Sequence, residues 1–332
     1  MKNFIEQLPK VELHLHIEGS LEPELMFKLA KRNNIELPFA TIDDVKAAYQ
    51  FSNLQDFLDI YYAGCNVLIT EQDFYDLAFA YYKKANEQNI IHTEIFFDPQ
   101  SHTDRGISIE TVVKGLRRAM KDAEQQFGIT SHLILSFLRH LSEKEAIDTL
   151  KSVENMKDEF IAVGLDSSEV GNPPQKFQEV YKMAAEQGYL KVAHAGEEGP
   201  AQYIWDSMSL LNIDRLDHGN RAMDDEKLLQ ELKDRKMGLT LCPLSNLKLQ
   251  VVKDLRNHPV KKMLDLGLKA TVNSDDPAYF GGYMNENFIA IQEALNLSKK
   301  DLFALTVNAI EVSFADDKRK QEMKNQLSTY FA

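Results

Sequence analysis

The chain has 332 residues, of which 44% are hydrophobic, a content typical of a globular protein and too high for a disordered one. Its 51 acidic and 38 basic residues give a net charge of −13, which argues against nucleic acid or a membrane surface as a partner. The two cysteines, Cys65 and Cys242, exclude a disulfide framework and a Cys-rich zinc site. Because the sequence also lacks an apolar leader and any apolar run of membrane-spanning length, we expect a cytoplasmic protein.

Short apolar runs alternate with segments of helical periodicity along the whole chain. The runs predict eight strands, at residues 11–17, 90–97, 132–138, 160–165, 190–195, 215–218, 237–242 and 268–273. Eight strands that are each followed by a helix favour an α/β fold, a (β/α)₈ TIM barrel over residues 1–332, rather than two open sheets. The first two strands are ~75 residues apart and the later ones ~25 to 30, which predicts a helical insertion after the first strand, roughly at residues 34–85.

One segment of this insertion has an apolar stripe at helical spacing. Asn53 is followed by Leu54, Phe57, Leu58 and Tyr61. Two interpretations fit a helix over residues 54–65: it packs against the core, or it is a mobile lid that keeps water away from a bound substrate.

The first predicted strand carries His14 and His16 two positions apart. Alternate residues of a strand point to the same side, so both imidazoles can reach one point. Neutral imidazole is a good ligand for ions such as Zn²⁺, which favours a metal site. The pair taken alone fits a polar barrel interior equally well.

Further ionisable residues stand where other predicted strands end. His194 ends the fifth strand, His218 the sixth, and Asp275 follows the eighth. In this fold the C-terminal ends of the strands form the rim that carries the active site. Three imidazoles and one carboxylate suffice for one divalent ion, with a position left for water, and such a set suits both Zn²⁺ and Fe²⁺.

The remaining rim residues supply the groups that a hydrolysis needs. His218 is a candidate for the base that takes a proton from water, and Glu197, three residues after His194, for the acid that protonates the substrate. Asp276 is a candidate for a hydrogen bond to the substrate. Two alternatives stay open: a solvated loop carboxylate for Glu197, and a helix N-cap before Pro277 for Asp276.

The motifs resemble those of the adenosine/adenine deaminase family of the metal-dependent amidohydrolase superfamily. Five of them occur in the family's order: His14-Leu-His16-Ile-Glu18-Gly19-Ser20, His194-Ala-Gly-Glu197, Asp217-His218-Gly219, Cys242-Pro-Leu-Ser-Asn246 and Ser274-Asp275-Asp276-Pro277. The resemblance implies a hydrolase of purine salvage whose metal ligands are His14, His16, His194 and Asp275. It also implies that Glu197 donates a proton to purine N1, His218 orients the water, and Asp276 contacts N7.

Departures from the family pattern bear on the number of metals and on the substrate. The fourth strand ends without the lysine of the binuclear relatives, so we expect one metal. Glu18 stands where adenosine deaminases usually have an Asp that touches ribose, and Ser167 where they have a Gly that contacts N3. Both changes should shrink the ribose end of the pocket, as in the adenine deaminase branch.

We therefore expect a small-molecule purine substrate and the conversion of adenine and water to hypoxanthine and ammonia, with Glu18 and Ser167 at the substrate. An adenosine deaminase is the close alternative; an amidohydrolase of amides or lactones and a barrel that only binds purines are more distant ones. The sequence carries no signal of the oligomeric state.

Overall fold

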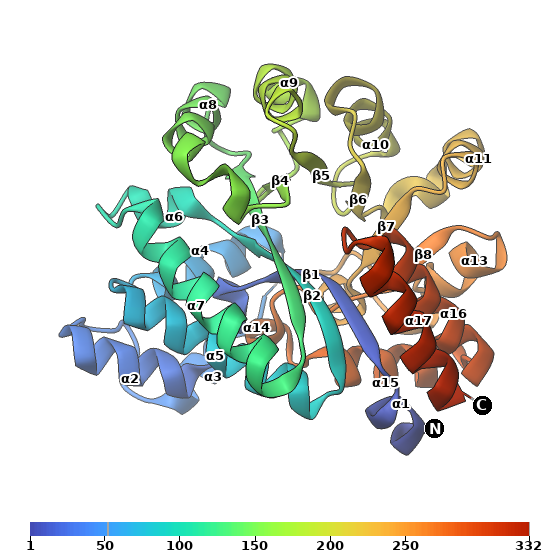
Figure 1. The fold of residues 1–332 in the computed structure, drawn as a ribbon, viewed down its shortest axis with the longest axis horizontal. Coiled ribbons are helices and arrows are strands. Elements are labelled where there is room, and N and C mark those ends of the chain that lie inside the picture. The colour runs from blue at the N-terminus through green and yellow to red at the C-terminus, as the bar shows by residue number, and fades with distance from the viewer. Residues whose placement is uncertain (52, 332) are drawn as a thin grey trace.

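The computed structural model describes residues 1–51 and 53–331, and it contains eight parallel strands in one sheet. Each strand pairs with the next in chain order: β1 (Lys10–His16), β2 (Ile90–Phe97), β3 (Thr130–Leu138), β4 (Ala162–Asp166), β5 (Leu190–Ala195), β6 (Arg215–His218), β7 (Gly238–Leu241) and β8 (Lys269–Val272). The residues after β8 return to β1, where the Asp275 amide donates to the His14 carbonyl (3.1 Å) and the His16 amide to the Asp275 carbonyl (3.0 Å). The predicted (β/α)₈ barrel is confirmed, with every strand within two residues of its expected start (Figure 1).

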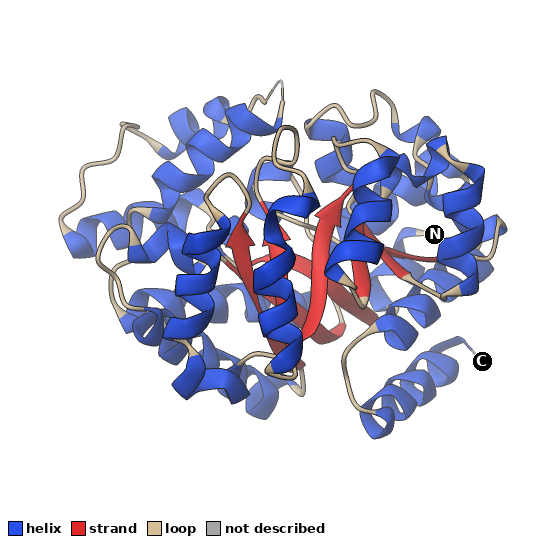
Figure 2. Cartoon of the chain, turned by 90° about the horizontal axis from the view of Figure 1, so that it is seen from above, coloured by secondary structure: helices blue, strands red, loops and turns tan. Residues whose placement is uncertain are grey.

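Helices surround the strands on all sides, so the sheet lies in the interior (Figure 2). Those that follow β2 to β8 are α6 (Pro99–Thr103), α7 (Ile109–Phe127), α8 (Glu143–Ser152), α9 (Gln178–Glu186), α10 (Ala201–Asp206), α11 (Glu226–Asp234), α12 (Pro243–Lys248), α13 (Val260–Asp265), α14 (Pro277–Phe280), α15 (Met284–Leu295), α16 (Lys299–Val312) and α17 (Asp317–Phe331), and α1 (Lys2–Gln7) precedes β1. Most of their apolar side chains join those of the strands in one buried core.

The connection between β1 and β2 contains four helices, α2 (Pro23–Asn33), α3 (Ile42–Ala48), α4 (Leu54–Cys65) and α5 (Glu71–Glu87). Helix α4 begins at Asn53, whose side chain accepts a hydrogen bond from the Asp56 amide (3.0 Å). Its stripe packs against α14, with the Phe57 and Phe280 ring centroids 4.7 Å apart. This contact holds α4 over the C-terminal ends of the strands.

Three residues at or just after the C-terminal ends of strands have an unusual, left-handed backbone conformation. Ser167 follows β4, His218 ends β6 and Asp275 follows β8, and all three have positive φ angles, of 73°, 61° and 66°. A non-glycine residue in this region costs about 1 kcal/mol or more, and such residues concentrate where a side chain has to be aimed at a functional site. The turns therefore direct these three side chains into the rim of the barrel.

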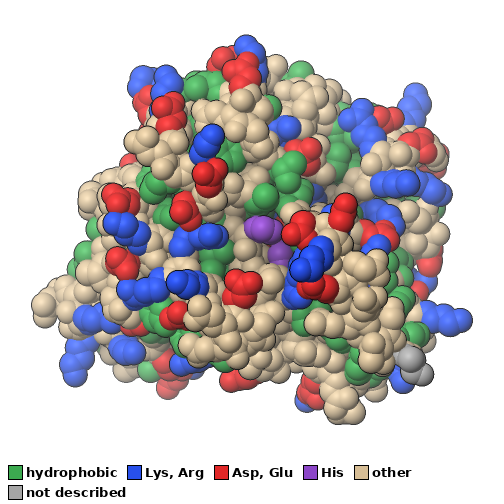
Figure 3. Space-filling model, viewed as in Figure 1, with side chains coloured by type: hydrophobic (Ala, Val, Ile, Leu, Met, Phe, Trp, Pro, Cys, Tyr) green, Lys and Arg blue, Asp and Glu red, His purple; other side chains and the backbone are tan. Residues whose placement is uncertain are grey.

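The face seen in Figure 3 carries acidic and basic side chains intermixed. Among the helices of residues 1–51 and 53–331, none is both long and apolar enough to cross a membrane.

Candidate active site

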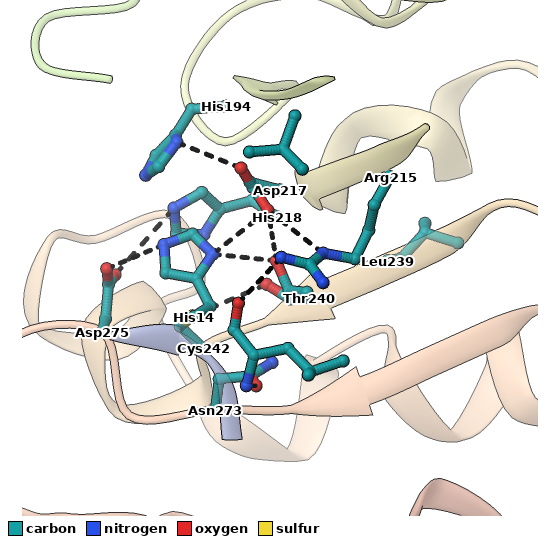
Figure 4. A network of polar contacts seen from close by, with 12 residues as sticks. His14, His194, Arg215, Asp217, His218, Leu239, Thr240, Cys242, Asn273 and Asp275 are labelled. Atoms are coloured by element: carbon teal, nitrogen blue, oxygen red, sulfur yellow. Dashed lines mark hydrogen bonds and ion pairs between the residues drawn. The ribbon is translucent and has the colours of Figure 1, made fainter. Parts of the chain in front are cut away.

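Histidine and aspartate side chains from four strand ends meet at the rim. One nitrogen of each of His14, His194 and His218 and one oxygen of Asp275 lie within 4.8 Å of one another (Figure 4). The His14 Nε2 is 3.1 Å from the Asp275 Oδ1, and the His16 Nε2 is 3.2 Å from the His194 Nε2. The structure thus brings together all four expected ligands, and it places His218 equally close.

Polar groups behind two of the imidazoles fix their orientation. The His14 Nδ1 is 2.8 Å from the Thr240 hydroxyl, which donates to Asp217 (3.1 Å), so the hydroxyl accepts the His14 Nδ1 proton. The other oxygen of Asp217 is 3.7 Å from the Nδ1 of His194 (Figure 4). With the proton of His14 on Nδ1, its Nε2 lone pair faces the centre of the cluster, the arrangement that metal-binding histidines commonly have.

The other two imidazoles differ in what lies behind them. The His16 Nδ1 is 3.5 Å from Asp166, whereas the buried His218 Nδ1 has no hydrogen-bond partner among the described residues. The His218 Nε2 lies 3.6 Å from Glu197 and 3.9 Å from Asp275. His16 therefore has a carboxylate near its Nδ1, whereas His218 contacts its neighbours, Glu197 and Asp275, only through Nε2.

The charge state of the cluster suits a cation. Burial lowers the pKa of His16 to about 4 and that of His194 well below its usual value, so both rings are neutral and able to bind a metal. Burial alone would raise the pKa of Asp275, but the adjacent His14 and His218 hold it below its usual value. The His14 Nε2 and the Asp275 Oδ1 are buried without a hydrogen-bond partner in the part of the chain that the structure describes, although unpaired buried groups of this kind are costly. These donors fit a divalent ion of the zinc type.

Two carboxyl groups beside the cluster have the opposite charge state. Burial raises the pKa of Glu197 well above its usual value, and Asp275 raises it further. The pKa of Asp276 is also raised by burial and by its neighbours Asp275 and Glu197. Burial therefore favours the protonated form of both carboxyls, the form that can donate a hydrogen bond to a ligand.

The position of Asp276 decides between two interpretations of this residue. Asp276 precedes α14, but its side chain makes no capping hydrogen bond, and its Oδ1 is buried without a partner among residues 1–51 and 53–331. A Cβ atom on Gly19 would lie only 2.0 Å from that oxygen, so the glycine leaves room for the carboxyl group. Asp276 consequently faces the cavity and does not cap the helix.

A cavity opens beside the cluster and carries many acids. Its lining includes five carboxyl groups and, among the described residues, no lysine or arginine: His16, Leu54, Phe57, Leu58, Tyr61, Tyr62, Asp98, Asp166, Ser167, His194, Glu197, His218, Leu249, Asp275, Asp276 and Phe280. The apolar members come mainly from α4. The cavity offers apolar faces to a flat ring and polar groups to its edges.

Glu18 lies behind this lining. It is fully buried, and the His102 Nε2 donates to it at 2.8 Å, because the His102 Nδ1 accepts from Arg105. Glu18 in turn accepts a hydrogen bond from the Asp98 amide (3.3 Å), and Tyr61 donates to Asp98 (3.1 Å). Glu18, which the sequence singled out for contact with the substrate, is bonded to two residues of the cavity lining, Asp98 and Tyr61, without being part of that lining, and its contact with the substrate stays a prediction.

Asp98 and Asp166 are functional candidates that the sequence did not identify. Asp98 directly follows β2 and Asp166 ends β4, so the position at a strand end was the signal that could have found them. Burial raises the pKa of Asp166 to about 7, and burial together with Asp166 raises that of Asp98 well above its usual value.

Ser167, which the sequence singled out for contact with the substrate, lines the cavity next to Asp166. Its hydroxyl is 3.1 Å from the Tyr62 hydroxyl of α4 and 2.8 Å from the His140 Nδ1. These bonds tie α4 to the turn after β4. Opening and closing of α4 as a lid stays a prediction.

One buried carboxylate holds the loop that carries Glu197. Glu169 accepts hydrogen bonds from the backbone amides of four consecutive residues, Gly196, Glu197, Glu198 and Gly199, at 2.7 to 3.1 Å. A Cβ atom on Gly199 would lie 2.5 Å from the Glu169 Oε1, so only glycine lets the carboxylate approach this closely. Glu169 therefore fixes the backbone from which Glu197 reaches the cavity.

Comparison with known proteins gives consistent matches over nearly the whole chain. A model of the adenosine deaminase family matches residues 9–330. An adenine deaminase from Rhodospirillum rubrum is 60% identical over 325 residues, which cover 98% of this chain and 97% of that protein. The crystal structure of an adenine deaminase from Arthrobacter aurescens superimposes with a TM-score of 0.96 at 47% identity, covering 98% and 99% of the two chains. An amidohydrolase from Burkholderia ambifaria with bound Zn has a TM-score of 0.91 at 28% identity, covering 99% and 92%.

Proposed function

Because the chain belongs to the adenosine deaminase family, we propose that it is an adenine deaminase, which converts adenine and water to hypoxanthine and ammonia. The observation that carries the choice of adenine is the lining of the cavity, with five carboxyl groups and no cationic side chain among the described residues. A phosphate group would find no cationic side chain to pair with there, which disfavours nucleotides. Relatives at 52–60% identity that are adenine deaminases support the same substrate.

We propose that His14, His16, His194 and Asp275 hold one divalent ion, Zn²⁺ or Fe²⁺, and we favour Zn²⁺ because the Burkholderia ambifaria relative binds it. Among the described residues, a hydroxyl or carboxylate oxygen lies 2.8 to 3.7 Å from the Nδ1 of His14, His16 and His194, although only the His14 contact is a hydrogen bond, and none is recorded at the Nδ1 of His218; this supports His218 as the base outside the ligand set. When bound, the ion supplies Lewis-acid activation of water for attack at C6.

The residues around this centre then perform the proton transfers. Glu197, which keeps its proton through burial, donates it to N1 and makes C6 more electrophilic. Burial lowers the pKa of His218 to about 3, so the neutral imidazole accepts a proton from the attacking water. Asp276 donates a hydrogen bond to N7, and the aromatic side chains of α4 exclude bulk water.

The experiment is a comparison of kcat/KM for adenine, adenosine, AMP and guanine on protein loaded with zinc, with elemental analysis of the same sample. We expect ammonia release from adenine with a kcat/KM above that for every other compound. A higher kcat/KM for adenosine would overturn the proposal in favour of adenosine deaminase, and ammonia release from none of the four would argue for a binding protein.

A further inference from the structure

Asp98 and Asp166 form a pair of buried carboxyl groups that the proposed mechanism does not use. The two side chains are only 3% and 2% exposed, and one oxygen of each lies within 4.8 Å of the other and of a ring nitrogen of His16. Both line the cavity. They are held from different strand ends, which fixes them relative to each other and to His16.

Most of the oxygen atoms in this pair lack a donor. Tyr61 donates to the Asp98 Oδ2, but the Asp98 Oδ1 and both oxygens of Asp166 have no donor among the described residues apart from a proton that the two carboxyl groups can share. The Nδ1 of the neutral His16 ring lies 3.5 Å from Asp166. Buried carboxyl oxygens without a partner destabilise a fold unless a ligand supplies donors. A pair of this kind on a cavity wall points to an N–H group of the ligand.

The orientation of adenine places one such group opposite the pair. If C6 faces the histidine cluster, N1 faces Glu197 and N7 faces Asp276, then N3 and N9 lie on the opposite edge of the purine. Asp166 lies across the His16 ring from the cluster, because the Nε2 of His16 faces His194 and its Nδ1 faces Asp166. Of the five carboxyl groups that line the cavity, Asp98 and Asp166 are the two that the proposed mechanism leaves free for this far edge of the base.

We propose that Asp98 and Asp166 accept the hydrogen bond of the N9–H group of adenine and thereby select the free base. This inference rests on the proposed function. In a nucleoside N9 carries the sugar, so there is no N9–H to donate, and the sugar would collide with the two carboxyl groups. A site built around a ligand N–H rejects an analogue that lacks it, because its own polar groups are then buried unpaired.

The test uses 9-methyladenine, which keeps N1, C6 and N7 and lacks only the N9–H group. The enzyme is compared with Asp98→Asn, which keeps the shape of the side chain, and with Asp98→Ala, which removes the acceptor and opens space. We expect kcat/KM for adenine to fall about 10-fold in the first variant and up to about 100-fold in the second, the range for leaving a buried N–H donor without its acceptor. The kcat/KM for 9-methyladenine should not fall in either variant, and it should rise in Asp98→Ala.

Two controls separate specificity from stability. Asp206→Asn changes an aspartate of α10 that is 8% exposed and distant from the cavity lining, and it should leave the ratio of the two kcat/KM values unchanged. Asp166→Asn should lower the ratio of kcat/KM for adenine to kcat/KM for 9-methyladenine, as Asp98→Asn does. The zinc content of the Asp166→Asn variant reports whether the contact with His16 matters for metal binding.

The outcomes distinguish this inference from the proposed function. Wild-type enzyme that releases no ammonia from adenine would overturn both. Wild-type enzyme that uses adenine and 9-methyladenine equally well, or an Asp98 variant that loses both activities by the same factor, would overturn the inference alone.

Discussion

Replacing Glu169 with glutamine tests whether its carboxylate positions the catalytic acid. The carboxylate takes four backbone N–H groups, one on Oε1 and three on Oε2. Glutamine keeps the shape of the side chain but has only one oxygen. If that oxygen occupies the Oε2 position, the NH₂ group occupies the Oε1 position, and the Gly196 N–H then faces another donor and has no acceptor. One unsatisfied buried donor costs about 1–3 kcal/mol, and the three remaining bonds lose their charge assistance. A loss of about 2–3 kcal/mol of loop stabilisation, felt fully in the transition state, lowers kcat about 30- to 150-fold.

The assay is steady-state deamination of adenine by the Glu169→Gln variant, with metal content and thermal unfolding measured on the same sample. The exposed Glu186 at the end of α9 provides a matched control, since Glu186→Gln should leave kcat within about twofold. Because the metal ligands are unchanged, the Glu169→Gln variant should retain its metal. A kcat close to wild type would refute the positioning role, and so would a loss of activity that only follows a loss of metal.

Three further changes test other parts of the site and the fold. Glu197→Gln should lower kcat by about 10²–10⁴-fold at unchanged metal content, as removal of a general acid does, and near-normal turnover would remove Glu197 from that role. Chelation of the metal should abolish turnover and added Zn²⁺ or Fe²⁺ should restore it; activity that persists in metal-free protein would contradict the assigned cluster. Burial lowers the pKa of Lys10 from 10.5 to about 7, so between these values the folded protein binds fewer protons than the unfolded chain and its stability rises with pH. Between pH 7 and 9 the free energy of unfolding in urea should therefore rise more steeply for wild type than for Lys10→Met, by up to about 1.4 kcal/mol per pH unit. The same pH dependence in both proteins would show that Lys10 is not the cause.

The elements of the barrel could be predicted from sequence because local patterns decide them. The expected strand over residues 90–97 is the observed β2, and the expected strands over 190–195 and 215–218 are β5 and β6. Each is a short apolar run between helical segments, and burial on both faces leaves no other place for such a run. The rule that the rim lies at the C-terminal strand ends then located His14 and Asp275 near each other.

The contacts that connect distant segments could not be predicted in this way. The link from Arg105 through His102 to Glu18 joins the turn after α6 to the turn after β1. His102 has no partner at a recognisable spacing, so a structural or surface histidine was the reasonable expectation. Glu169 likewise has its effect 27 to 30 residues further along the chain, on amides that any sequence would supply. Backbone donors leave no trace in a side-chain pattern.

The residues around the cavity share one property that relates stability to function. Asp98, Asp166, Asp275 and Asp276 all have buried oxygens for which the described residues supply no hydrogen-bond partner, and His218 and Asp275 also have positive φ angles. Each of these features lowers the stability of the folded chain, and the apolar core beneath the rim has to compensate for them. A cation among the imidazoles and a base with N–H groups at its edges would satisfy the same atoms. We therefore infer that the polar groups of the rim are fully paired only when metal and purine are both bound. This explains why these residues destabilise the unliganded fold and at the same time select the ligand.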